Sequence, residues 1–183
     1  MSEAMIVRHC SPTLAGLKTA NMFTCPFESG EGLLNDLRSI NIRLGRKGVR
    51  AIPLRIKDGR ALIYFYRPKK LENDLKSPVS EEILGSSGYE SGTVSARLAE
   101  LIKRLRRCED FPHEIGLFLG YPPEDVRCFM CERSRECRCV GCWKAYSNEA
   151  EAEKTFARYK KCTEVYVSRL EKGSSLERLT VAG

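Results

Sequence analysis

The stretch "RAIPLRIKDGRALIYFYR" at residues 50–67 decides the fold class, because its apolar residues alternate while those of the neighbouring segments recur with a helical period. Every second residue from Ile52 to Ile56 is apolar, as on one face of a strand. The pair Asp58-Gly59 is typical of a two-residue hairpin turn, and an aromatic-rich segment follows it. We therefore predict a β-hairpin, with Pro53 on an edge strand because proline cannot donate to a sheet ladder.

Helical patterns precede the hairpin. An apolar stripe with helical spacing predicts one helix directly before it: Leu33, Leu37, Ile40 and Leu44. Gly45 stands where that helix should end. Further upstream, Ser11-Pro12 is typical of an N-cap followed by proline in the first turn, so we predict a helix over residues 12–22.

Helices also dominate the second half of the chain. The patterns predict a short helix at 77–84, a basic amphipathic helix at 93–107, a helix beginning near 121–126 and a short strand at 139–146. A long helix should follow Asn148 and Glu151, which have capping-box spacing.

We therefore expect an α+β fold with helices packed on a small, mostly antiparallel sheet. The expected organisation is a single domain over residues 1–171 and a disordered tail over residues 172–183.

Length and composition limit the class of protein. The chain has 183 residues, enough for a proper core, and its apolar runs are too short to span a bilayer. Its first residues lack the basic and apolar regions of a secretory signal, so we expect a cytoplasmic protein without a membrane span. Nine cysteines in such a compartment favour free thiols over disulfides.

The net charge of +7 is concentrated in two basic segments, residues 43–60 and 97–107. Such segments can bind phosphate-rich partners, and they are equally typical of solvated faces of a hairpin and a helix. An acidic protein or a nucleic acid is therefore a candidate partner, although no nucleic-acid-binding motif accompanies the charge.

Cys10 is the first candidate for chemistry. If a helix begins directly after an N-cap at Ser11, its dipole and its free N–H groups favour the Cys10 thiolate and lower the thiol pKa from about 8.5 toward neutrality. His9 beside it could assist as a base or as a metal ligand. The alternative is a buried cysteine where a strand meets a helix.

The segment "FPHEIGLFLGYPPEDV" at residues 111–126 holds the second candidate site. His113 is the only histidine besides His9, and a cysteine hydrolase needs a histidine base and a third group that orients it. Glu114 is adjacent, although successive side chains point apart. We predict that Cys10 and His113 meet in one pocket lined by the "LGYP" turn, with Cys10, His113 and Glu114 as catalytic candidates. The alternative for His113 is a solvated residue at a helix start.

Five cysteines lie close together in "CFMCERSRECRCVGC" and form the third candidate: Cys128, Cys131, Cys137, Cys139 and Cys142. Two C-x-x-C pairs are typical of tetrahedral zinc sites, and an iron–sulfur cluster uses the same ligands. The gap between the pairs is shorter than in a usual zinc ribbon, and five thiols exceed the four that zinc needs. His9 is a further candidate metal ligand. The alternative is that these cysteines are ordinary helix and strand residues.

The chain resembles an uncharacterised bacterial family, a domain of unknown function found mainly in anaerobic Gram-positive bacteria. The resemblance rests on "RHCSPTLAGLKTANMF", "LIYFYRPKKL", "FPHEIGLFLGYPPEDV" and "GCWKAY", which span residues 8–146. The "PHE" motif at His113 and Glu114 and the "LGYP" motif at residues 119–122 match the family. The resemblance implies no established activity, and the motifs that carry it do not include the full set of five cysteines.

A weaker resemblance links "HCSPTLAGLK" to the helix-opening motif of papain-like cysteine peptidases. It implies Cys10 as nucleophile and His113 as base. Ser11 replaces the usual glycine, the histidine segment has a helical pattern, and no residue is clearly the orienting Asn or Asp.

Three function classes follow. The protein is a thiol-based metal-binding or redox-linked protein, a papain-like cysteine hydrolase, or a non-catalytic adaptor that binds an acidic partner or nucleic acid through its basic faces. We slightly favour the first, with zinc or an iron–sulfur cluster as the cofactor.

Overall fold

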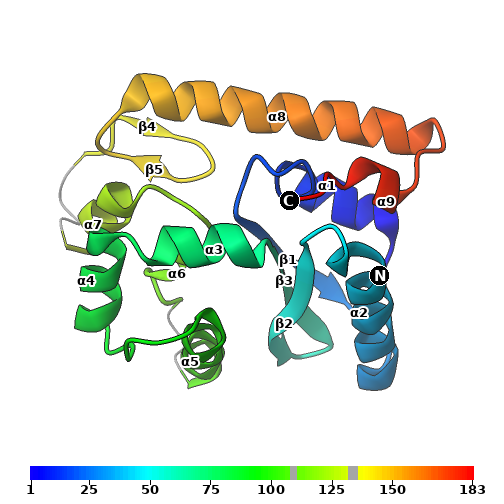
Figure 1. The fold of residues 1–183 in the computed structure, drawn as a ribbon, viewed down its shortest axis with the longest axis horizontal. Coiled ribbons are helices and arrows are strands. Elements are labelled where there is room, and N and C mark those ends of the chain that lie inside the picture. Colours follow the sequence, from blue (N-terminus) through cyan, green and yellow to red (C-terminus); the bar gives the residue numbers. More distant parts are fainter. Residues whose placement is uncertain (108–110, 132–135) are drawn as a thin grey trace. The chain divides into compact units, whose positions relative to one another are not determined.

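The computed structural model describes residues 1–107, 111–131 and 136–183, and these form an α+β fold (Figure 1). Where one domain was expected over residues 1–171, the chain groups into two compact units. Unit 1 comprises residues 1–69 and 159–183, and unit 2 comprises residues 70–158. Each unit is described by itself below.

Unit 1 is built on a three-stranded antiparallel sheet of β1 (Ala20–Pro26), β2 (Arg50–Lys57) and β3 (Arg60–Tyr66), in the order β1-β3-β2. The predicted hairpin is confirmed as β2 and β3. Asp58 and Gly59 both have positive φ, 49° and 69°, as the two central residues of a type I′ hairpin turn require.

The edge position predicted from Pro53 is also confirmed, because β2 pairs only with β3 among the described strands. The N–H and C=O of Ala51 both bond to the carboxamide of Asn41 at 2.8 Å, so they point away from β3. Pro53, two residues further on, faces the same way and has no N–H to offer. The outer edge of β2 is thereby closed to further strand pairing.

Two helices pack on the sheet. α1 (Glu3–Leu14) and α2 (Gly30–Gly45) both contribute to the core of unit 1. α2 has the predicted apolar stripe, since Leu33, Leu37, Ile40 and Leu44 are all buried. Beneath these helices the core contains Phe23, Cys25, Ala61, Ile63 and Phe65 from the strands.

The helix predicted over residues 12–22 is wrong. α1 begins at Glu3, where Ser2 is the N-cap, and ends at Leu14, and the following segment forms β1. Pro12 lies in the last turn instead of the first. The buried guanidinium of Arg67 donates to the carbonyls of Thr13 and Leu14 at 2.7 and 2.8 Å, which satisfies the end of the helix from a distant part of the chain.

The predicted disordered tail at residues 172–183 is also wrong. It contains α9 (Leu176–Leu179), whose two leucines are buried in the core of unit 1. Arg43 of α2 forms ion pairs with Glu3 and Glu177. Lys47 donates to the carbonyls of Glu177 and Thr180 at 2.6 and 2.8 Å, so the segment is held by charged side chains from α2 and the turn after it.

Unit 2 is mainly helical and confirms the helices predicted at 77–84, at 93–107 and from 121–126. Its elements are the larger part of α3 (Pro68–Leu75), α4 (Pro78–Ser86), α5 (Val94–Arg107), α6 (Ile115–Phe118), α7 (Pro123–Cys131), the two-stranded hairpin of β4 (Cys139–Val140) and β5 (Lys144–Ala145), and the first part of α8 (Glu149–Glu171).

Two details refine the predicted elements of unit 2. The short strand expected at 139–146 is instead a small hairpin. Asn148 accepts a hydrogen bond from the backbone N–H of Glu151 at 3.2 Å, so it caps α8 as predicted. In the part of the chain that the structure describes, no helix combines the length and apolar character needed to cross a membrane.

Candidate functional site

The five cysteines of the predicted metal site, here called the thiol cluster, all lie in unit 2 on two neighbouring elements: Cys128, Cys131, Cys137, Cys139 and Cys142. Cys128 and Cys131 lie on the last turns of α7. Cys137 lies immediately before the β4–β5 hairpin, Cys139 begins β4, and Cys142 lies on the hairpin turn. All five are free thiols that are at least partly exposed. α7 contacts β5, so the elements that carry the two C-x-x-C pairs are packed together.

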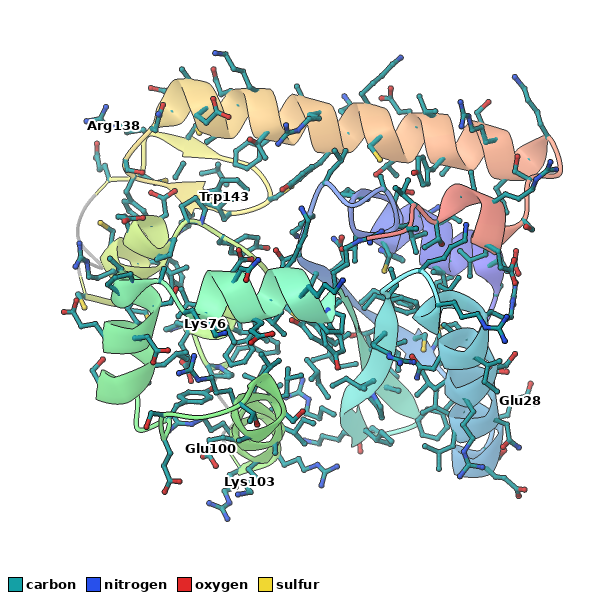
Figure 2. All side chains as sticks on the ribbon, viewed as in Figure 1. Glu28, Lys76, Glu100, Lys103, Arg138 and Trp143 are labelled. Atoms are coloured by element: carbon teal, nitrogen blue, oxygen red, sulfur yellow. The ribbon has the colours of Figure 1, made fainter. Side chains whose placement is uncertain are left out.

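The hairpin fixes the second C-x-x-C pair. Its ends are joined by the N–H of Arg138 donating to the carbonyl of Ala145 at 2.8 Å, and its turn by the N–H of Gly141 donating to the carbonyl of Trp143 at 3.0 Å. Figure 2 labels Arg138 and Trp143 on this hairpin. A Cβ atom at Gly141 would overlap the ring of Phe156, so the turn between Cys139 and Cys142 lies directly against α8.

Asp125 joins α7 to the hairpin. Its Oδ1 accepts hydrogen bonds from the N–H of Tyr146 at 2.9 Å, the N–H of Ser147 at 3.0 Å and the hydroxyl of Ser147 at 2.9 Å. Its Oδ2 accepts from Nε1 of Trp143 at 2.9 Å. The carboxylate is buried, so four donors converge on one fixed group. The two C-x-x-C pairs therefore share a rigid anchor.

The sequence patterns did not identify this anchor. The acids of "PPEDV" indicated only a favourable first turn of a helix. The one available signal was Trp143, because a buried tryptophan usually donates its indole N–H to an acceptor. A single sequence does not show which upstream carboxylate is that acceptor.

The pKa shifts of Tyr146 and Cys139 show which charged groups lie near the thiol cluster. Burial is the main cause that raises the pKa of the Tyr146 phenol, and Cys137, Cys128 and Asp125 raise it further. Burial likewise raises the pKa of Cys139, followed by the carboxylates of Glu149 and Glu153. The carboxylates near Cys139 therefore disfavour a thiolate there that has no compensating positive charge.

No group of three or more His, Cys, Asp or Glu side chains that could hold a metal ion is assembled within residues 1–107, 111–131 and 136–183. The predicted metal ligands therefore stay predictions. His9 lies in unit 1, on α1, where its exposed ring stacks on Phe23 with the ring centres 5.0 Å apart.

The thiolate predicted at Cys10 is wrong. Cys10 lies in the second half of α1 instead of ahead of a helix, so no N-terminal dipole acts on it. Its side chain is fully buried in the core of unit 1, and burial strongly raises the pKa of the thiol, with Lys18 opposing the effect. The proposed catalytic role of Cys10 stays a prediction without the electrostatic basis that suggested it.

His113 and Glu114 lie in unit 2, in the turn before α6. The half-buried His113 ring meets Phe129 edge-on at 5.0 Å. Glu114 is buried, accepts a hydrogen bond from the hydroxyl of Tyr89 at 3.1 Å and lies 3.5 Å from the guanidinium of Arg104. These contacts stabilise α6 against α5 and the loop that follows α4, and a catalytic role for either residue stays a prediction.

Cys10 and His113 belong to different units, so their predicted meeting in one pocket also stays a prediction.

Comparison with known proteins gives a family but no characterised relative. No curated protein and no solved structure matches the chain. One family model matches residues 6–180, which include all three candidate sites and α9. This confirms the resemblance to a family of unknown function: the chain belongs to the family described as "Protein of unknown function (DUF3793)".

Proposed function

We propose that this protein is a metal-binding protein, in which the thiol cluster of unit 2 binds one thiophilic divalent cation, with zinc as the ion that fits best. The observation that carries the proposal is the anchoring of both C-x-x-C pairs by Asp125, through α7 on one side and the hairpin on the other.

The spacing of each pair suits a shared ion. Cys128 and Cys131 are three residues apart on a helix, so their side chains emerge on the same side. Cys139 begins β4 opposite Ala145, and Cys142 lies in the turn of the same hairpin, so this pair is carried by one short hydrogen-bonded segment. Tetrahedral zinc takes four thiolates at about 2.3 Å, and these four cysteines supply that number.

The proposed ligands are therefore Cys128, Cys131, Cys139 and Cys142, and Cys137 is the thiol left over. Its position before β4 makes it the matched control, because it lies in the same cluster and is partly exposed, as its neighbour Cys139 is. Asp125 holds α7 and the hairpin segment together, and the proposal requires the four thiols to converge on the ion when it binds.

The experiment is a cobalt titration of the reduced, metal-free full chain. Four thiolates around Co²⁺ give intense sulfur-to-metal absorption bands, and zinc should then displace the cobalt. We expect one equivalent to bind to the wild type and to the Cys137→Ser variant. The Cys139→Ser and Cys142→Ser variants should lose the four-thiolate spectrum.

Absence of a thiolate spectrum in the wild type would refute the proposal. Equal loss in Cys137→Ser and Cys139→Ser would refute the ligand assignment. A Cys25→Ser variant serves as a further control, because Cys25 is buried in the core of unit 1 and should have no effect on the spectrum.

A further inference from the structure

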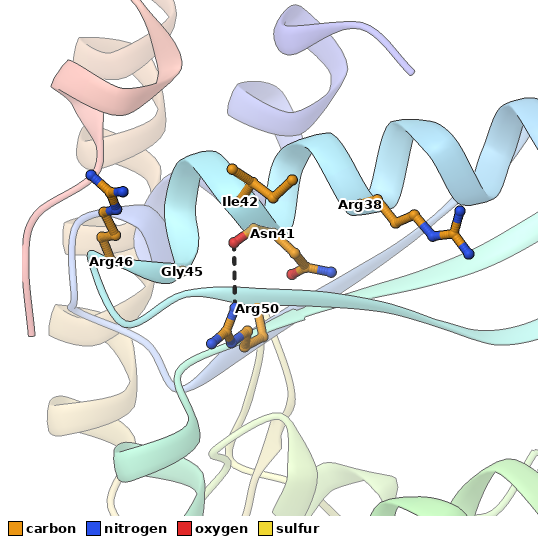
Figure 3. A pocket seen from close by; sticks show the side chains of 6 residues that line it. All are labelled: Arg38, Asn41, Ile42, Gly45, Arg46 and Arg50. Atoms are coloured by element: carbon orange, nitrogen blue, oxygen red, sulfur yellow. Dashed lines mark hydrogen bonds between the residues drawn. The ribbon is translucent and has the colours of Figure 1, made fainter.

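Unit 1 has a surface pocket of about 570 Å³ between α2 and the start of β2 (Figure 3). Its lining consists of Arg38, Asn41, Ile42, Gly45, Arg46 and Arg50. Half of these residues are arginines, and none is acidic. The volume falls in the range of about 300–1,000 Å³ that is usual for small-molecule sites.

The fold places the three guanidinium groups around the pocket. Arg38, Ile42 and Arg46 follow one another at intervals of four residues, so they share one flank of α2 and its C-terminal end. Figure 3 shows Arg50 reaching toward this helix from β2. Its Nη1 donates to the carbonyl of Asn41 at 3.3 Å, and its guanidinium lies so close to Gly45 that any side chain there would overlap it.

The arginines at the two ends of the pocket are available to a ligand. Among the described residues, the exposed side chains of Arg38 and Arg46 make no ion pair or hydrogen bond, whereas Arg43 on the same helix is paired with both Glu3 and Glu177. The carboxamide of Asn41 is fully used on the edge of β2. Three positive charges therefore line the pocket without a carboxylate to neutralise them.

This chemistry fits phosphate. The planar fork of arginine binds phosphate oxygens through paired hydrogen bonds, and clustered positive charge attracts a ligand that carries several negative charges, whether on a terminal phosphate group or on successive phosphodiesters. Ile42, which is 75% exposed at the same pocket, adds an apolar surface for a ring. We propose that the pocket binds the phosphate of a nucleotide, either free or within a polynucleotide, with Ile42 against the base.

The test is calorimetric titration of the full chain at low salt with pyrophosphate, ATP and a short oligouridylate. The double variant Arg38→Gln/Arg46→Gln should weaken binding by about tenfold or more, because it removes two phosphate contacts. The control Arg8→Gln/Arg60→Gln removes the same charge from exposed positions of unit 1 outside the pocket and should change the affinity less than about twofold.

Comparing the three ligands distinguishes a free nucleotide from a polynucleotide as the source of the phosphate. Tight binding of ATP assigns a free nucleotide, and binding of the oligouridylate alone assigns a polynucleotide. Ile42→Ser should weaken the binding of either base-containing ligand and leave pyrophosphate unchanged. Absence of binding by all three ligands would overturn the proposal, and so would equal losses in the pocket and control double variants. Because the thiol cluster lies in unit 2, these results are independent of metal binding.

Discussion

The Asp125→Asn substitution is expected to destabilise unit 2 although it leaves the number of heavy atoms in the side chain unchanged. Oδ1 accepts three hydrogen bonds from Tyr146 and Ser147, and Oδ2 accepts one from the indole of Trp143. The amide oxygen of asparagine can keep the first three. Its NH₂ group must then face the indole N–H, so two donors meet and that bond is lost.

The size of the effect follows from these four bonds. A hydrogen bond to a charged group contributes about 1.5–3 kcal/mol, so losing the indole bond should cost about 2 kcal/mol. The three retained bonds become neutral and weaker, and the exposed Ser147 can turn to water instead. We therefore expect a total loss of about 3 kcal/mol in the free energy of unfolding.

Urea unfolding followed by far-ultraviolet circular dichroism measures this loss in four proteins: the wild type, Asp125→Asn, Trp143→Phe and the double variant. The Trp143→Phe variant has no indole N–H that could face the asparagine NH₂ group. In that variant Asp125→Asn should therefore lower the free energy of unfolding by about 2 kcal/mol less than it does in the wild type. Additive costs, or a loss below about 1 kcal/mol for Asp125→Asn alone, would refute the assignment of Asp125 as the anchor.

Three further substitutions or probes test other parts of the structure. Gly141→Ala should lower the free energy of unfolding by about 1–3 kcal/mol, because its methyl group would overlap Phe156. Glu177→Gln should cost about 1 kcal/mol at neutral pH after solvent screening, since the hydrogen bond from Arg43 lowers the pKa of Glu177 to about 2. That stabilisation is present above the ordinary pKa of 4.5, so the difference between variant and wild type should vanish as the pH falls toward 2. Cys10 should resist iodoacetamide in the folded protein, because its thiol is buried and its pKa is raised.

Each of these three predictions can be contradicted by a specific result. Unchanged stability of Gly141→Ala would mean that the hairpin turn does not lie against Phe156. A Glu177→Gln difference that persists at pH 2 would exclude the carboxylate as its cause. Alkylation of Cys10 as fast as that of the exposed Cys142 would contradict the burial of Cys10, and mass spectrometry of the labelled peptides measures both rates.

The parts of the fold that local chemistry determines were predictable from the sequence. Asp58-Gly59 specifies its turn because both residues accept positive φ, and Pro53 marks an edge strand because it has no N–H. The stripe from Leu33 to Leu44 predicts α2 through its period alone. In each case the cause lies within a few residues of the effect.

Long-range contacts explain the predictions that were wrong. α1 ends at Leu14 because Arg67, more than fifty residues later, satisfies its carbonyls. The C-terminal segment is ordered because Arg43 and Lys47 hold it and two leucines reach the core of unit 1. A Ser-Pro pair and a polar tail carry no local sign of such partners.

The candidate site was likewise predictable only where local sequence determines it. The cysteine spacing identified the thiol cluster, since C-x-x-C is a local pattern. Asp125 was missed because its four donors come from the β4–β5 hairpin and the segment that follows it, eighteen to twenty-two residues later in the chain. The expectation of a thiolate at Cys10 failed because it depended wholly on where a helix begins.

Native mass spectrometry of the reduced full chain, mixed with a small excess of zinc, tests metal binding by the thiol cluster most directly. The measured mass should increase by one zinc ion with loss of the protons of four thiols, and a variant with serine at Cys128, Cys131, Cys139 and Cys142 should show the metal-free mass only. A wild type that stays metal-free, or a four-serine variant that still binds one ion, would contradict the assignment of these cysteines as the metal site.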